Sequence, residues 1–331
     1  MSSSPRKHHE PGPVLQWILD SDPSIRWQAL RDLTGASLEE VATERRRVST
    51  DGAGARLLAL QDANEQWGGA TWNRGWNSTM HVLMLLREMG LDPGSDAARR
   101  AISRVSVRVA WRDCGPPEAH NNPFFDGETE PCINGQVGAA GAYFGQNVQR
   151  LVGRLLAEQL SDGGWNCEAA KGSKRSSFNT TICVLEALLE HEQNFGASSA
   201  VTAARRRGQE YLLERRLFRR RSTGEVIDQD RKGGAVWTNF AFPTWWHYEV
   251  LRGLEYLRRA GAVPDDRLSE AIQLVESKCG ADGRWFLETQ YPGVMPVQTD
   301  EGAGRASRWI TLRSLRILKW YWAPRPEGTR S

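Results

Sequence analysis

Carboxylates crowd the stretch from residue 126 to residue 132, which ends in a cysteine. Asp126, Glu128 and Glu130 occupy alternate positions, and Cys132 follows two residues later. Carboxylates beside an apolar cavity repel one another, so the pKa of one of them should rise far enough for it to hold a proton. Such a group can act as a general acid, and Glu130 or Asp126 is the candidate. The alternative is that these carboxylates interact with the positive N-terminus of a helix that begins at Pro131.

A metal site could also form around Cys132. Thiolates and carboxylates are zinc ligands, so Cys132, Glu130 and Cys167 could bind zinc, with His247 completing the shell. The alternative is that Cys132 is a small buried helix residue. No other cofactor is indicated. The five cysteines are odd in number and contain no CxxC pair, which argues against a disulfide scaffold and favours a reducing, cytoplasmic compartment.

His247 and Glu249 form a second candidate catalytic pair. They follow Trp245 and Trp246 at the start of an apolar helix that the pattern predicts over 244–260. A histidine there could donate a proton or bind a metal, because its pKa lies near neutral pH. The alternative is that His247 simply makes a hydrogen bond at the start of the helix.

Tryptophan is unusually frequent, with fourteen residues in a chain of 331. Many of them lie in turns and at helix starts, where an indole can line a cavity or fill the gap between helices. Indole faces stabilise cations, and they also stack on sugar rings. The candidates for contact with a substrate are Trp72, Trp76, Phe125, Trp165, Asn179, Trp237, Trp245, Trp246 and Trp309.

The stretch 155–192 shows the unit that must position these residues. It predicts a helix, a turn at the glycine pair 163–164 that ends this helix, a polar loop and a second, apolar helix. Ser176, Ser177 or Asn179 can cap the second helix by accepting its free backbone N–H groups. The same plan of helix, turn with tryptophan and helix recurs along the chain in degenerate form.

The recurrence predicts an all-α fold in which apolar and polar-faced helices alternate. The apolar helices are expected to begin at Pro23, Asn77, Pro131, Phe178, Thr244 and Ser307. Asp22 is the expected cap of the first, and one polar-faced helix is expected over 38–61. Because a repeat that cannot bury its own face must stack on its neighbours, we expect a single (α/α)6 toroid. It would have six inner and six outer helices around a central cavity. The inner-helix N-termini would open on one face, where function is expected.

The predicted domain organisation is a disordered leader over residues 1–12, the toroid over 13–323 and a tail over 324–331. The leader contains no apolar segment typical of a signal peptide. No apolar run approaches 18 residues, so no membrane span is expected. The net charge of +3 does not indicate nucleic-acid binding. Arginine outnumbers lysine by 37 to 6, which we interpret mainly as genome composition rather than as an ion-pair network.

Gln159, Gly163 and Trp165 form a Q-x3-G-x-W pattern that resembles the QW repeat of squalene-hopene and oxidosqualene cyclases. Gly283-Arg284-Trp285 is a partial second copy. A further resemblance is to the β subunits of protein prenyltransferases, whose zinc site combines a D-x-C segment with a histidine at a later helix start. Glu130-Pro131-Cys132 resembles the first segment, and Phe178-Asn179-Thr180-Thr181 resembles the second, with Asn179 in place of the histidine. Both groups of enzymes share an α/α toroid.

These resemblances imply a terpenoid-cyclase or prenyltransferase-like enzyme. Its expected substrate is a small apolar, isoprenoid-like molecule in an aromatic-lined cavity, with assistance from carboxylates. The D-x-D-D acid motif and the D-D-x-x-D diphosphate motif of such enzymes are absent from the sequence. Three alternatives stay open: a zinc-dependent cyclase or transferase that activates a thiol or water, a carbohydrate-active (α/α)6 enzyme, and a non-catalytic binding toroid. The sequence does not indicate an oligomeric state.

Overall fold

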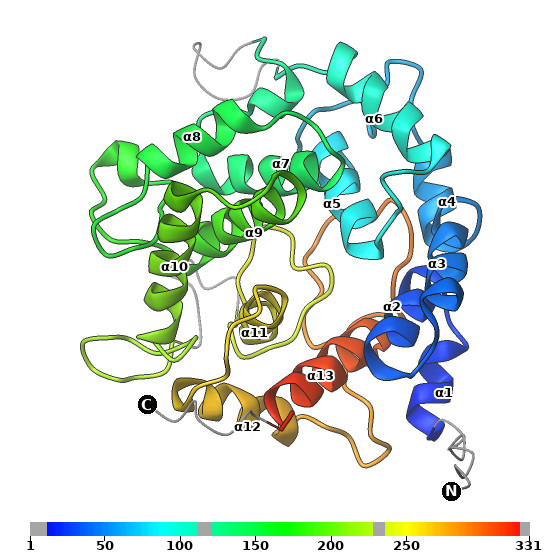
Figure 1. The fold of residues 1–331 in the computed structure, drawn as a ribbon, viewed down its shortest axis with the longest axis vertical. Helices are drawn as coiled ribbons and strands as arrows, with labels where there is room; N and C mark the ends of the chain where they lie inside the picture. The colour runs from blue at the N-terminus through cyan, green and yellow to red at the C-terminus, as the bar shows by residue number, and fades with distance from the viewer. Residues whose placement is uncertain (1–11, 112–120, 228–235, 325–331) are drawn as a thin grey trace, which may run out of the picture.

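The computed structural model describes residues 12–111, 121–227 and 236–324 (Figure 1). Within these residues every regular element is a helix, and β-type pairing is limited to isolated bridges. The predicted all-α class is therefore confirmed. The predicted leader and tail lie outside the described residues, apart from residues 12 and 324. Among the described helices, none combines the length and the apolar character needed to cross a bilayer.

The helices follow one another with short turns or longer loops between them. The α-helices are α1 (Pro13–Leu19), α2 (Pro23–Leu33), α3 (Leu38–Arg46), α4 (Gly52–Ala59), α5 (Thr79–Met89), α6 (Asp96–Arg108), α7 (Pro131–Tyr143), α8 (Gln149–Ala157), α9 (Phe178–Phe195), α10 (Ser199–Leu213), α11 (Val250–Arg259), α12 (Ser269–Ser277) and α13 (Arg308–Tyr321). The 3-10 helices are η1 (Arg47–Ser49), η3 (Phe124–Asp126), η4 (Ala169–Lys171) and η5 (Asp266–Leu268).

These helices form a closed ring, which Figure 1 shows from one end. Going round it, α5 packs against α7, α7 against α9, α9 against α11, α11 against α13 and α13 against α2, while α4 contacts both α2 and α5. The first and last parts of the chain therefore close the ring. Helices α3, α8, α10 and α12 pack against this ring from the periphery. The predicted toroid is thus present, whereas the count of six inner and six outer helices stays a prediction.

Three buried tryptophans explain the recurring turn. Each indole N–H donates to a backbone carbonyl ten residues earlier, near the end of an outer helix, and each backbone N–H donates to a threonine hydroxyl in the next inner helix. The residues are Trp67 with Leu57 and Thr79 (2.7 and 3.2 Å), Trp165 with Leu155 and Thr181 (2.6 and 3.0 Å), and Trp285 with Val275 and Thr311 (2.7 and 3.0 Å). The tryptophan therefore fastens the end of an outer helix to the start of the next inner helix.

The closest packing in the ring lies between α7 and α9. A Cβ atom added to Gly135 of α7 would lie 2.5 Å from the carbonyl carbon of Cys183 in α9, so the two backbones are in direct contact there. Only glycine permits this approach, because every other residue would force the helices apart. The small-residue composition of α7 thus serves close helix packing.

The predicted start of the apolar helix at Thr244 is wrong. The structure begins α11 at Val250, and Trp245 has a positive φ of 51°. The guanidinium of Arg252 explains the irregular segment, because it donates to the carbonyls of Trp245 (2.8 Å) and His247 (2.7 Å). These bonds satisfy carbonyl groups that a continuous helix would have used internally. His247 therefore lies in a loop, and Glu249 is the N-cap of α11.

Two further boundaries differ from the prediction. The single helix expected over 38–61 is divided into α3, η1 and α4. The break occurs because Gly52 takes a positive φ of 69° and the side chain of Asp51 caps the N-terminus of α4. Helix α8 ends at Ala157, so the glycine pair 163–164 belongs to the turn and does not end the helix. By contrast, Asp22 caps α2 as predicted, and of the three candidate caps for α9 it is Ser177 that accepts the backbone N–H of Thr180.

Candidate functional site

A cavity of about 430 Å³ lies at the centre of the ring. Residues of α2, α3, α5, α7, α9, α11 and α13 line it, together with the loop before α11. Eight arginines and four carboxylates contribute to this lining, so we call it the arginine cavity. Five aromatic residues also line it, and of the nine candidates for substrate contact these include Trp245. The centre of the toroid is therefore strongly charged as well as aromatic.

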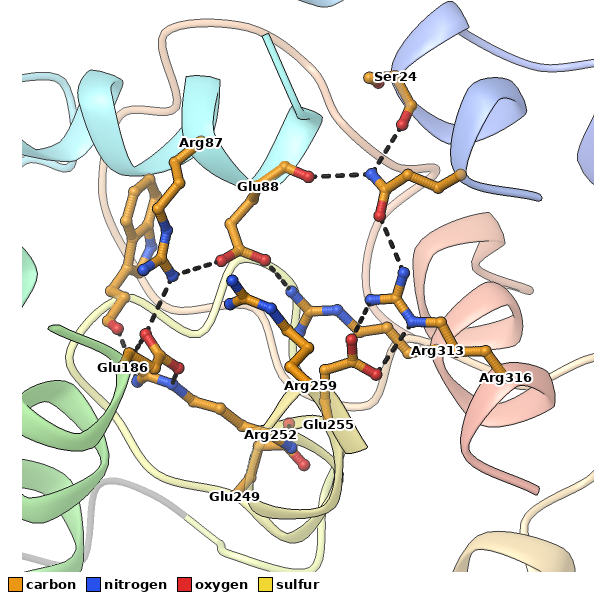
Figure 2. A network of polar contacts seen from close by, with 12 residues as sticks. Ser24, Arg87, Glu88, Glu186, Glu249, Arg252, Glu255, Arg259, Arg313 and Arg316 are labelled. Atoms are coloured by element: carbon orange, nitrogen blue, oxygen red, sulfur yellow. Dashed lines mark hydrogen bonds and ion pairs between the residues drawn. The ribbon is translucent and has the colours of Figure 1, made fainter. Parts of the chain in front are cut away.

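Ion pairs between helices connect the charged residues of this cavity (Figure 2). Glu186 of α9 lies between Arg87 of α5, at 3.0 Å, and Arg252 of α11, at 2.8 Å. Glu88 bridges Arg87, at 2.7 Å, and Arg313 of α13, at 2.6 Å. The network therefore joins helices that are far apart in the sequence. We interpreted the high ratio of arginine to lysine mainly as genome composition, but these arginines do form an ion-pair network.

A further pair extends the network towards α2. Glu255 of α11 pairs with Arg316 of α13 at 2.6 Å, and Arg316 also lies 3.4 Å from Asp32 of α2. Arg316 donates to the side-chain carbonyl of Gln28 at 2.9 Å. Figure 2 shows the pair of Glu255 and Arg316 beside Arg313. The charged centre thus also ties the last inner helix to the first.

The arginines keep the carboxylates of the cavity ionised. Burial by itself would raise the pKa of Glu186, but Arg252 and Arg87 outweigh it and hold this pKa at about 2. Against the same effect of burial, neighbouring arginines lower the pKa values of Glu88, Glu255 and Asp32. Burial lowers the pKa of Arg316 to about 10, which leaves it protonated at neutral pH. Near pH 7 the four carboxylates are therefore negative and Arg316 is positive.

A second, smaller cavity of about 200 Å³ shares Phe242, Pro243 and Trp245 with the first. Leu287, Tyr291 and Met295 also line it, so we call it the aromatic pocket. Asp300 supplies a carboxyl group to this lining. It accepts hydrogen bonds from the hydroxyl of Ser307 and from the backbone N–H of Glu301. Burial nevertheless raises the pKa of Asp300 to about 6, so this carboxyl can hold a proton close to neutral pH.

Two of the predicted catalytic residues, His247 and Glu249, lie in the segment that leads into α11. His247 is sandwiched between Trp246, at a ring distance of 3.8 Å, and Tyr291 of the pocket, at 3.6 Å. Glu249 is fully buried and accepts the backbone N–H groups of Leu251 and Arg252. Burial raises the pKa of Glu249 to about 8 despite these bonds. The structure therefore gives Glu249 a helix-capping position and His247 a position beside the aromatic pocket.

The predicted metal ligands do come together. One ligand atom from each of Glu130, Cys132 and Cys167 lies within 4.8 Å of the others. The Cys132 Sγ atom is 3.7 Å from Glu130 Oε2, and the backbone N–H of Cys132 points to the Cys167 Sγ atom at 3.4 Å. Burial and the charge of Glu128 raise the pKa of Glu130, in the direction that the crowding of carboxylates predicts.

The thiol pair is asymmetric, and two other predicted residues are engaged elsewhere. The contact with Cys167 and then burial raise the pKa of Cys132 well above its usual range, whereas the same contact lowers that of Cys167. Asn179 uses its side-chain oxygen to accept the backbone N–H of Tyr248 at 2.7 Å. Asp126 pairs with Arg150 at 3.1 Å on the surface. Among the described residues, the cluster therefore offers two thiols and one carboxylate.

The remaining aromatic candidates mostly fill helix gaps. Trp76 stacks on Trp245 with ring centroids 5.2 Å apart and donates to the carbonyl of Pro292. Trp309 stacks on Phe242 at 4.2 Å, which places it behind the aromatic pocket. Three other candidates contact a neighbouring ring: Trp237 lies 4.6 Å from Phe178 and Phe125 lies 5.0 Å from Phe124, both between ring centroids, and Trp246 stacks on His247. Trp165 lies in the turn before α9, and Trp72 is half-buried against the core.

Sequence reasoning missed the residues that dominate both cavities. Arg87 and Glu88 interrupt the apolar helix α5, and Glu186 interrupts the apolar helix α9. A charge within an otherwise apolar inner helix is the signal that could have located the arginine cavity, because a buried charge needs a partner. Asp300 lies in a loop of ordinary composition, and no comparable pattern marks it.

No protein-family model matches the sequence, and a comparison with curated proteins gives no match. Among solved structures, the chain is similar to the type II terpene cyclase MstE from Scytonema, with 16% identity, a TM-score of 0.42 and coverage of 89% of this chain and 85% of that chain. A protein from Actinoplanes is 17% identical, with a TM-score of 0.43 and coverage of 91% and 90%.

A third similar structure is ent-copalyl diphosphate synthase from Streptomyces platensis, with 16% identity and a TM-score of 0.38. The similarity covers 89% of this chain and 48% of that chain. Terpene cyclases, the group whose sequence repeat this chain resembles, are thus among the solved structures similar to it.

Proposed function

We propose that this chain is a terpenoid-cyclase-like enzyme that protonates an apolar, isoprenoid-like substrate in the aromatic pocket. The observation that supports the proposal is the position of Asp300. Its carboxyl group belongs to a pocket lined by Phe242, Trp245 and Tyr291, and burial raises its pKa to about 6. A general acid works best when its pKa lies near the working pH. In this proposal Asp300 is the general acid, in place of Glu130 and Asp126, the two candidates from the sequence.

The chemistry that this arrangement allows is a proton transfer to a carbon–carbon double bond. The Asp300 O–H bond breaks, a C–H bond forms with the π electrons of the alkene, and a positive charge develops on the other carbon. The aromatic lining of the pocket, which includes Trp245, stabilises that cation. Ser307 and the N–H of Glu301 donate to the carboxylate that remains. Loss of a proton from the cyclised cation to water gives a neutral product, and a proton from solvent restores Asp300.

His247 has a positioning role in this proposal. It stacks on Tyr291, which lines the pocket, and its Nδ1 atom lies 3.2 Å from the carbonyl of Thr244. This stack fixes one wall of the pocket, in the irregular segment that precedes α11. His247→Ala should therefore weaken substrate binding more than it slows turnover, which a comparison of KM and kcat would reveal.

The test is product formation from acyclic isoprenoid alcohols of increasing length, followed by gas chromatography and mass spectrometry. The native protein should give a cyclised product, and Asp300→Asn should give none, because an amide cannot supply the proton. Asp96→Asn removes an exposed carboxylate on α6 and should leave product formation unchanged. Equal product from Asp300→Asn, or no cyclised product from the native protein with any chain length, would contradict the proposal.

A second candidate function is zinc-dependent activation of a thiol or water. The specific observation in its favour is the cluster of Glu130, Cys132 and Cys167, which offers a donor set that zinc accepts. These three residues would hold the ion, and zinc would supply Lewis-acid activation when bound. The carbohydrate-active and non-catalytic alternatives stay predictions.

Metal content measured by mass spectrometry on the purified protein tests this second candidate. About one zinc per chain, lost in Cys132→Ala, would support it. Cys279→Ala is the matched control, because Cys279 is an exposed free thiol away from the cluster, and it should keep the zinc. The native protein and the control are incubated with zinc and then dialysed against zinc-free buffer. If neither of them retains zinc, this candidate fails.

A further inference from the structure

The arginine cavity carries more positive charge than its own carboxylates neutralise. Eight arginines line it against four carboxylates, and Glu190 outside the lining pairs with Arg259, so an excess of three positive charges remains. The carboxylates are Asp32, Glu88, Glu186 and Glu255, and the arginines around them hold the pKa of each one low, so they are fully ionised near pH 7. Buried charge without a counter-charge is costly. The cavity therefore favours a negatively charged occupant.

Some of the buried guanidinium groups also have unused hydrogen-bond donors. The side chains of Arg87 and Arg313 are only 5% exposed. The Nε atoms of both, and the Nη1 atom of Arg87, make no hydrogen bond with the described residues. That Nη1 atom lies 3.8 Å from a carboxylate oxygen of Glu190, an ion-pair distance beyond hydrogen-bond range. A buried donor left without an acceptor costs stability, and a bound oxygen atom would remove that cost.

A third arginine of the cavity has no carboxylate partner among the described residues. Arg45 of α3 donates to the carbonyl of Gly90 and to the hydroxyl of Tyr143, each at 2.9 Å. Both of these acceptors are neutral, so they leave the positive charge of Arg45 without a counter-charge. Arg45 reaches the cavity from the side of α3, whereas Arg87 and Arg313 reach it from α5 and α13. Three arginines with spare charge or spare donors thus converge from three helices.

We propose that the arginine cavity is a binding site for a small polyanion with phosphate or carboxylate oxygens, recognised by Arg45, Arg87 and Arg313. Guanidinium groups match such oxyanions because their N–H groups are fixed in a planar fork. An anion with several charges fits better than a singly charged one, because an excess of three positive charges remains once Glu190 is counted. A volume of about 430 Å³ limits the ligand to a small molecule or to the head group of a larger one.

The site is distinct from the proposed acid site, although both share one wall. Phe242, Pro243 and Trp245 line the arginine cavity on one side and the aromatic pocket on the other. Asp300 lines the aromatic pocket, and the three arginines line the arginine cavity. Anion binding can therefore be measured without any isoprenoid substrate, and its failure would leave the proposed acid chemistry untouched.

Isothermal titration of the full chain at constant ionic strength tests the proposal. The probes are inorganic diphosphate, inorganic phosphate, succinate and chloride. We expect saturable binding of one diphosphate or one succinate per chain, about tenfold or more tighter than phosphate, with chloride weakest. Whichever of diphosphate and succinate binds more tightly identifies the head group, and either supports the site. Phosphate or chloride binding as tightly as both of them would overturn the assignment to a polyanion.

Arg45→Gln is the informative variant, because it removes a positive charge without leaving a carboxylate unpaired. It should weaken polyanion binding about tenfold or more, since it removes a charge-assisted contact. Arg56→Gln removes the same charge from an exposed position on α4 and should bind like the native protein. If Arg45→Gln does not fold, Arg45→Lys keeps the charge, loses the planar fork and should still bind more weakly. Equal affinity in the folded Arg45 variant and in Arg56→Gln would overturn the proposal.

Discussion

Trp165 joins two helices through its two N–H groups. Phenylalanine cannot replace it, because a phenyl ring has no N–H group. Its indole N–H donates to Leu155 at the end of α8, and its backbone N–H donates to Thr181 in α9. Trp165→Phe removes the first bond and leaves a buried carbonyl without a donor. We expect the free energy of unfolding to fall by about 1–3 kcal/mol, measured by equilibrium unfolding in urea.

The control for this prediction is Trp322→Phe. Trp322 is 64% exposed, and its indole N–H donates to the exposed Glu276. Because water can replace that contact, the free energy of unfolding should change by less than about 0.5 kcal/mol. If Trp165→Phe is no more destabilising than this control, the recurring tryptophan is not the fastening that its hydrogen bonds indicate.

Glu186 tests the charged centre at the same scale. It is the shared partner of Arg87 and Arg252, and all three side chains are close to fully buried. Glu186→Gln keeps the shape but leaves the buried guanidinium of Arg252 without its carboxylate partner, while Arg87 keeps its contact with Glu88. We expect a loss of about 3–5 kcal/mol at pH 7, measured by urea unfolding. Glu225→Gln breaks the exposed pair with Arg220 and should cost at most about 1 kcal/mol, so a similar cost for both would contradict the burial argument.

At the scale of residues, the sequence predicted the proximity of one cluster of side chains but not the position of every indole. It correctly brought Glu130, Cys132 and Cys167 together, because they flank two helix starts that meet in the ring. It offered Trp165 as a substrate contact, although the structure uses that indole in the turn. Residue type alone cannot separate these roles, because an indole lines a cavity and fills a helix gap with the same atoms. Asp300 was missed because its raised pKa comes from burial by distant segments.

Helices α7 and α9 show how one element positions another. Gly135 lets the two backbones touch at Cys183, and a methyl group there has no space. Gly135→Ala should therefore destabilise the protein by about 1–3 kcal/mol, since the helices must separate to admit it. Gly153→Ala on the exposed face of α8 meets no atom within 4 Å and should stabilise by about 0.5–1 kcal/mol, as alanine usually does in a helix. Thermal unfolding of both variants would measure the contrast, and a shift in the same direction for both would contradict it.

Element boundaries were predictable where the cap is local. Asp22 and Ser177 accept backbone N–H groups within their own helix start, so the sequence around them is sufficient. The start of α11 was not predictable in this way. The carbonyls of Trp245 and His247 are taken by Arg252, and the backbone of Tyr248 is held by Asn179 of another helix. Such tertiary hydrogen bonds override a periodic apolar pattern.

At the scale of the whole molecule, the repeat predicts the toroid but not the contents of its centre. Stacking of apolar faces follows from the sequence because each repeat buries its neighbour. The centre depends on which positions of facing helices meet, and this differs from one helix to the next. Arg87 and Arg313, for example, are far apart in sequence and come together only at Glu88. The expected aromatic cavity thus contains a charged network that no single helix reveals.

One buried histidine and the charged centre should each contribute less to stability as the pH falls, in two steps. His81 is fully buried, and burial lowers its pKa from 6.5 to about 3. The unfolded chain therefore binds a proton at His81 first, so the contribution of His81 to stability falls as the pH drops below about 6.5, by about 2 kcal/mol at pH 5. Glu249 and Asp300 act in the opposite direction, because burial raises their pKa values to about 8 and about 6. The pKa of Glu186 is lowered from 4.5 to about 2, so its contribution is present above pH 4.5 and is lost as the pH falls towards 2.

Urea unfolding at a series of pH values between 7 and 3 separates the two steps. His81→Gln is neutral at every pH, so the difference in the free energy of unfolding between the native protein and this variant should fall by about 2 kcal/mol between pH 6.5 and 5. For Glu186→Gln the corresponding difference should be constant above pH 4.5 and fall below it, because the variant has already given up the ionised carboxylate at neutral pH. The four carboxylates of the arginine cavity act in the same direction, since the pKa of each one is lowered. A difference for Glu186→Gln that does not change below pH 4.5 would mean that the centre of the toroid is not held by this ionised carboxylate.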